Sequence, residues 1–144
     1  MLINFLLLDV VIMAMCWLIV TYNQRAGLVD VAWSFCIALN VMIAAFWLDT
    51  APISVRIFIG CASSIWFLRL TWHLLRRYWH ESEEDRRYAN MRRAMGAFQH
   101  LGFLAFFMFQ AGLAILFSYP MLSLLSTTQM QWNDWSSWVL IAAA

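Results

Sequence analysis

Residues 2–22 read LINFLLLDVVIMAMCWLIVTY, a continuous apolar run in which Asp9 is the one charged side chain. A helix of about 20 apolar residues is long enough to cross the hydrocarbon core of a bilayer. Three later runs, residues 28–48, 53–72 and 97–124, have the same character. The sequence therefore predicts an all-α fold, a polytopic transmembrane helix bundle with four complete spans.

A further apolar run occupies residues 138–144 and is much shorter than a span. We interpret it as the start of a fifth span. The chain is then expected to be a single membrane domain, residues 1–144, that forms part of a longer protein.

The composition agrees with a membrane protein and excludes nucleic-acid binding. Hydrophobic residues make up 64% of the chain and charged residues 12%, whereas about a quarter of the residues in soluble domains are charged. The formal net charge is +1, so the chain has no strongly basic surface of the kind that binds the phosphates of a nucleic acid. The three cysteines lie in apolar runs without paired spacing, which is typical of small buried side chains rather than of disulfides or metal ligands.

Residues 76–93, RRYWHESEEDRRYANMRR, hold most of the charge of the chain. Acids and arginines three and four positions apart favour a helix, which we predict over residues 76–96 and place along the membrane interface. Arg25 lies on the same side of the four-span topology. The positive-inside rule then places residues 76–96 in the cytoplasm and the N-terminus outside.

Ionisable residues inside spans are costly unless they are paired or hydrated, so they are candidates for function. Asp30 lies just inside the second span. In the third span, Arg69, His73 and Arg76 or Arg77 follow one another at helical spacing. These residues either line a polar cavity that holds phosphates through bidentate arginines, or form a structural Asp30–Arg69 ion pair between two helices.

Four motifs together resemble a known family. They are Asn23, VDVAW at 29–33, RLTWHLLRR at 69–77, and EDRRY at 84–88 followed by MRR at 91–93. In this order they resemble the N-terminal half of bacterial membrane proteins of the steroid 5-alpha-reductase superfamily, in a branch catalogued as a domain of unknown function. The resemblance places the chain in a bacterial inner membrane.

The resemblance implies an NADPH-dependent reductase of an activated C=C bond in a lipid-like substrate, steroid-like or isoprenoid-like. The cofactor-binding residues that it implies are Arg69, Arg76, Arg77, Glu84, Asp85 and Arg87. The candidates for polarising the substrate carbonyl are Asp30, Tyr88 and His73. The family's second half, with its Arg-His-Pro-Asn-Tyr type motif, has no counterpart here, so we expect this chain alone not to turn over substrate.

Two other functions fit the same residues. The chain is in one case a non-catalytic membrane subunit or scaffold whose charged helix docks a partner. In the other it is an enzyme similar to the isoprenylcysteine methyltransferases, which share the superfamily's C-terminal pattern and use a different cofactor.

Overall fold

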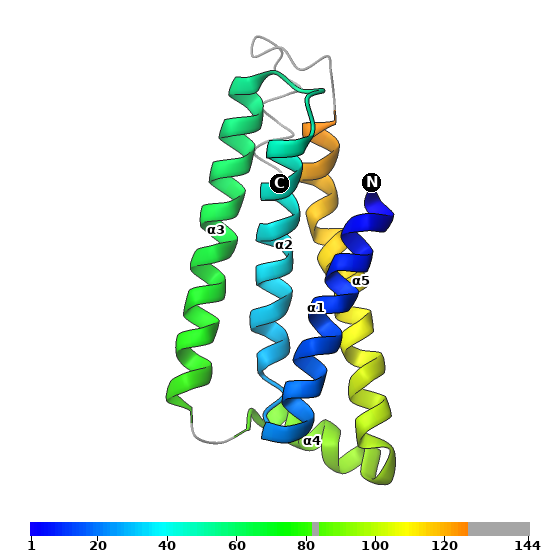
Figure 1. The fold of residues 1–144 in the computed structure, drawn as a ribbon. Coiled ribbons are helices and arrows are strands. Elements are labelled where there is room, and N and C mark those ends of the chain that lie inside the picture. The colour runs from blue at the N-terminus through cyan, green and yellow to red at the C-terminus, as the bar shows by residue number, and fades with distance from the viewer. Residues whose placement is uncertain (82–83, 127–144) are drawn as a thin grey trace.

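The computed structural model describes residues 1–81 and 84–126. The elements are α1 (Leu2–Asn23), α2 (Leu28–Trp47), α3 (Ile53–His80), α4 (Arg86–Met95), the 3-10 turn η1 (Gly96–Phe98) and α5 (Gln99–Leu125), as Figure 1 shows. Helices α1, α2, α3 and α5 are long and apolar enough to cross a membrane, α5 together with α4 forming the fourth candidate. The prediction of an all-helical integral membrane protein is therefore confirmed.

Helix α2 stands at the centre of the bundle and packs against α1, α3 and α5. Its buried side chains lie on several faces, from Val29 to Ala44, whereas α3 is buried along one face only. Gly60 of α3 allows the close approach of α2, because a Cβ added there would lie 2.6 Å from the Cβ of Ala45. Many large apolar side chains of the outer helices, such as Leu7 and Phe109, are exposed, as lipid contact requires.

The helix bounds differ from the predicted ones mainly in the charged segment. Residues 76–96 do not form one helix: α3 continues to His80, and α4 begins at Arg86. Asp85 is the N-cap of α4, and its side chain accepts a hydrogen bond from the Arg87 backbone N–H. Pro120 does not end the last span, because α5 continues to Leu125. The predicted fifth span at residues 138–144 lies outside the described residues.

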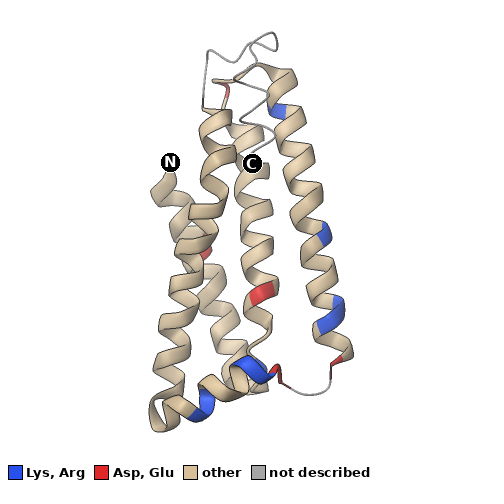
Figure 2. Cartoon of the chain, turned by 180° about the vertical axis from the view of Figure 1, so that it is seen from behind, with Lys and Arg blue, Asp and Glu red and all other residues tan. Residues whose placement is uncertain are grey.

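One end of the bundle collects most of the charge. It is formed by the turn at residues 24–27, the first turn of α2, the last turns of α3, residues 81, 84 and 85, and α4, which lies across the ends of the other helices (Figure 1). We call it the charged end. Figure 2 shows acidic and basic positions gathered there while the middle of the bundle is almost free of them.

Candidate functional site

Six of the predicted site residues lie together at the charged end. They come from α2, from the last turns of α3, and from the start of α4 with the turn before it. These residues are Asp30, Arg77, Glu84, Asp85, Arg87 and Tyr88. The packing of α4 across the bundle therefore joins positions up to 58 residues apart in the chain.

Asp30 and Tyr88 form the centre of the site. The Tyr88 hydroxyl donates a hydrogen bond of 2.8 Å to Oδ1 of Asp30. Oδ2 of Asp30 accepts from the Arg87 guanidinium at 3.3 Å. Tyr88 is 5% exposed and its ring packs against Phe106 of α5, with ring centroids 6.0 Å apart. A carboxylate of α2 is thus held against a phenol and a guanidinium of α4, and a ring of α5 packs against the phenol.

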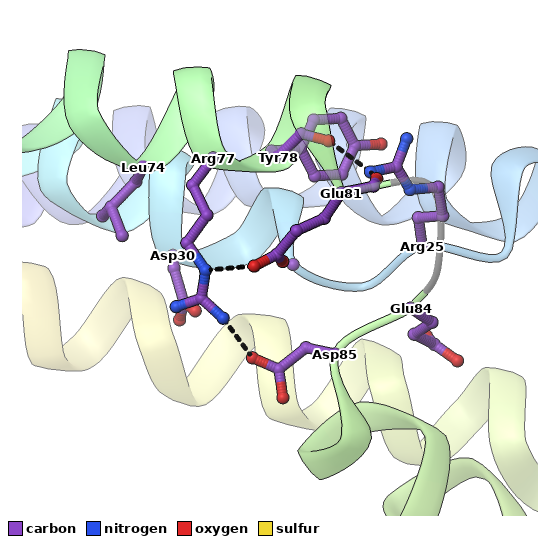
Figure 3. A pocket seen from close by; sticks show the side chains of 9 residues that line it. Arg25, Asp30, Leu74, Arg77, Tyr78, Glu81, Glu84 and Asp85 are labelled. Carbon is purple, nitrogen blue, oxygen red and sulfur yellow. Dashed lines mark hydrogen bonds and ion pairs between the residues drawn. The ribbon is translucent and has the colours of Figure 1, made fainter.

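Asp85 links the two arginines that border this centre. It accepts from the Arg87 guanidinium at 3.0 Å and from Arg77 at 3.4 Å. Hydrogen bonds from the Arg87 side chain and backbone N–H lower the pKa of Asp85, although burial opposes the shift. Arg77 also pairs with Glu81 at 2.7 Å, one helical turn away. Figure 3 shows Arg77 between Glu81 and Asp85.

A second pair of arginines, Arg25 and Arg92, stabilises the fold of the charged end. The Arg25 guanidinium donates to the backbone carbonyls of Tyr78 and Glu81 and lies over the Tyr78 ring, 4.2 Å from its centroid. It therefore caps the C-terminal end of α3, where free carbonyls attract a cation. Arg92 pairs with Glu84 at 2.7 Å, and both side chains are largely buried.

These structural roles of Arg25 and Arg92 were not predicted from the sequence. For Arg92 a signal existed, since it follows Tyr88 by four residues and so shares its helix face. The same spacing places both side chains toward the bundle. No comparable signal exists for Arg25, because its partners are backbone groups of a helix that is distant in the sequence.

The site encloses only a small cavity, about 30 Å³ in volume, which is space for about one water molecule. Residues from the 24–27 turn, α2, α3 and the 81–85 segment line it (Figure 3). The side chains of Arg87 and Arg77 are 64% and 47% exposed, whereas that of Arg92 is 18% exposed. Among the arginines of this ion-pair network, Arg77 and Arg87 are therefore the ones that a further anion can reach.

The other three predicted site residues lie elsewhere. Arg69, His73 and Arg76 share the exposed face of α3. The predicted Asp30–Arg69 ion pair is wrong: within residues 1–81 and 84–126, Asp30 pairs with Arg87, and no ion pair includes Arg69. The reason is the rotation of α3, whose buried face toward α2 carries small and apolar residues such as Gly60 and Ser64.

The sequence was compared with protein-family models, curated proteins and solved structures, and one family model matches it. A family model described as "Protein of unknown function (DUF1295)" matches residues 16–144. The chain belongs to the DUF1295 family. No curated protein and no solved structure matches it. The match covers α2 to α5 and the last turns of α1, and so includes every residue of the site at the charged end of this DUF1295 protein.

Proposed function

We propose that this DUF1295 chain contributes the phosphate-binding and carbonyl-polarising end of an NADPH-dependent membrane reductase that acts on an activated C=C bond of a lipid-like substrate. The motif resemblance to the steroid 5-alpha-reductase superfamily suggests this chemistry. The observation that carries it is the contact of Asp30, Tyr88 and Arg87, which unites two candidate catalytic residues with one candidate phosphate ligand.

The residues fit a phosphorylated cofactor through Arg77 and Arg87. Guanidinium groups bind phosphate oxygens bidentately, and these two side chains are about half exposed or more. NADPH would supply the hydride when bound. The cavity of about 30 Å³ is too small for a dinucleotide, so the phosphates would lie on the open side of Arg77 and Arg87, replacing Glu81 and Asp85 as partners.

Tyr88 would polarise the substrate carbonyl in this proposal. A phenol has one O–H, so Tyr88 donates either to Asp30 or to a substrate oxygen. When Tyr88 turns to the substrate, Asp30 keeps its contact with Arg87 and stays neutralised. Since Tyr88 is 5% exposed, the substrate would reach it only after the side chains that cover it, such as Phe106, rearrange. The apolar surroundings would strengthen the hydrogen bond to the carbonyl.

Binding of NADPH and NADH by the purified chain in lipid nanodiscs tests the proposal, with energy transfer from tryptophan to the reduced nicotinamide as the signal. If Arg77 and Arg87 hold the 2′-phosphate, which NADH lacks, NADPH binds about tenfold or more tightly than NADH, because a hydrogen bond to a charged group contributes about 1.5–3 kcal/mol. Arg87→Ala is expected to remove most of this preference. Arg87→Lys keeps the positive charge but lacks the planar guanidinium group, so it is expected to retain part of the preference for NADPH.

Arg86→Ala is the matched control. Arg86 is the neighbouring exposed arginine on the same turn of α4, and no ion pair joins it to the other described residues. It should leave the preference for NADPH unchanged. Equal binding of NADPH and NADH, or an equal loss in the Arg86 and Arg87 variants, would overturn the proposal.

One observation favours the scaffold function as the second candidate. The charged end holds four interacting arginines, Arg25, Arg77, Arg87 and Arg92, and four acids, Asp30, Glu81, Glu84 and Asp85, so the cluster is neutral. Such a network holds helices in place without a ligand. If nucleotide titrations show no binding while Arg87→Ala lowers the melting temperature, the charged end is a structural or docking element instead.

A further inference from the structure

Three polar side chains meet in the interior of the bundle, away from the charged end. They are Asp9 of α1, Asn40 of α2 and Ser118 of α5, and each is 0% exposed. Each lies seven residues from the helix end opposite the charged end, at Leu2, Trp47 and Leu125. At 1.5 Å per residue this is a common depth of about 10 Å. Three helices therefore place their polar groups at one level.

Two side-chain oxygens of this cluster have no hydrogen-bond partner. The Asn40 amide Nδ2 donates to Oδ2 of Asp9 at 2.9 Å and lies 3.4 Å from the Ser118 hydroxyl. Ser118 uses its own hydrogen on the carbonyl of Ala114, at 2.7 Å. Oδ1 of Asp9 and Oδ1 of Asn40 are buried without a partner. Both are acceptors, and among these three side chains no donor is bonded to either of them; the thiol of Cys36, which faces Asp9, is a weak donor.

Asp9 also lacks a counter-charge. Helices α1, α2 and α5, which pack together, contain no Lys or Arg, and no ion pair in the described part of the chain includes Asp9. The titratable group that faces Asp9 is the Cys36 thiol of α2. The other titratable side chains of the three helices are Cys16, Tyr22, Asp30, His100 and Tyr119. Asp30 lies ten residues from Asn40 along α2, about 15 Å away along the axis.

An ionised carboxylate in such a place is expensive, because a buried charge without a partner costs several kcal/mol. A proton on Oδ1 of Asp9 removes the charge and supplies the missing donor in one step. A metal cation would need several oxygen ligands, and the backbone carbonyls of these helices are occupied by their own hydrogen bonds. The two free oxygens therefore suit a proton better than a metal ion.

We propose that Asp9 is a proton-binding site inside the membrane bundle. The neutral acid donates from Oδ1 to Oδ1 of Asn40 while Asn40 donates to Oδ2, so that acid and amide pair reciprocally and join α1 to α2. Removal of the proton leaves an unpaired carboxylate among α1, α2 and α5 and loosens their packing. This site is separate from the charged end and does not depend on the function proposed there.

Infrared spectroscopy of the full chain in nanodiscs detects the proton directly. The C=O stretch of a neutral carboxyl group is expected at pH 7 in the natural chain and absent in Asp9→Asn. It should return in the exchanged variant Asp9→Asn with Asn40→Asp, which again contains one acid and one amide of the same size. If Asp9→Asn instead removes the bands of an ionised carboxylate, the proposal is wrong.

The pH dependence of thermal unfolding gives a second, independent test. As the pH rises above about 4, the ordinary pKa of a carboxyl group, the natural chain should lose thermal stability relative to Asp9→Asn, because only its folded state keeps the proton, whereas the amide of Asp9→Asn supplies the same donor at every pH. Cys36→Ala in both backgrounds removes the facing thiol from the comparison. Equal pH profiles for the two chains, or stabilisation of the natural chain by Na⁺ but not by protons, would overturn the proposal.

Discussion

Replacement of Tyr88 by Phe isolates one hydrogen bond of the charged end. The substitution keeps the aromatic ring against Phe106 and removes the O–H that donates to Asp30 at 2.8 Å. Hydrogen bonds to charged groups contribute about 1.5–3 kcal/mol to stability. The Asp30 side chain is 30% exposed, so water replaces part of the lost contact. We therefore expect the lower end of that range, about 1.5 kcal/mol.

A double-mutant cycle separates this contact from other effects. Tyr88→Phe, Asp30→Ala and the double variant are unfolded in detergent micelles, with tryptophan fluorescence as the signal. The two sites are expected to couple by about 1 kcal/mol or more, because they touch directly.

The matched control is Tyr78→Phe. The Tyr78 ring lies against Arg25, and no hydrogen bond from its hydroxyl to another described residue is present. Its free energy of unfolding should change by less than about 0.5 kcal/mol. A coupling below about 0.3 kcal/mol, or an equal loss from Tyr78→Phe, would refute the assigned Tyr88–Asp30 contact.

Three further predictions concern packing, acid stability and orientation. Gly60→Ala should destabilise the fold by about 1–3 kcal/mol in thermal unfolding, because its Cβ would lie 2.6 Å from that of Ala45, whereas Gly112→Ala, with open space around it, should not destabilise. The lowered pKa of Asp85 means that its stabilising effect is present above the ordinary carboxyl pKa and is lost as pH falls below about 4; Asp85→Asn should remove this acid loss, as measured by hydrogen exchange in α4. A cysteine in place of Arg86, in a chain without the three native cysteines, should react with an impermeant maleimide from the cytoplasmic side only, and labelling from outside would reverse the orientation.

The spans were predictable because the membrane imposes a local rule. A backbone in lipid must satisfy its hydrogen bonds within the helix, so the length of an apolar run alone indicates a span. Helices α1 and α2 accordingly end within one residue of the predicted bounds. The end of α3 at His80 and the new start of α4 at Arg86 were missed, because acid–base spacing favours a helix equally before and after this point. Asp85 marks the new start as the N-cap of α4.

The sequence predicted only some of the residues that form the site. Asp30 stood out as a charged residue just inside an apolar span, and the family resemblance implied Arg87 and Tyr88; the structure brings the three together. Helical spacing also selected Arg69 and His73, which share a face of α3, but the face is turned outward. Spacing shows which residues share a face of a helix and carries no information on where that face points.

The amino-acid sequence by itself determined the class of this DUF1295 protein, its four spans and the segment that carries its charge. These properties depend on hydrophobicity and length, which are local. The tertiary structure alone decided which charges pair and that Asp9 meets Asn40 and Ser118 in the interior. Those contacts depend on the rotation and depth of each helix relative to its neighbours, which the combined packing of α1, α2, α3 and α5 sets.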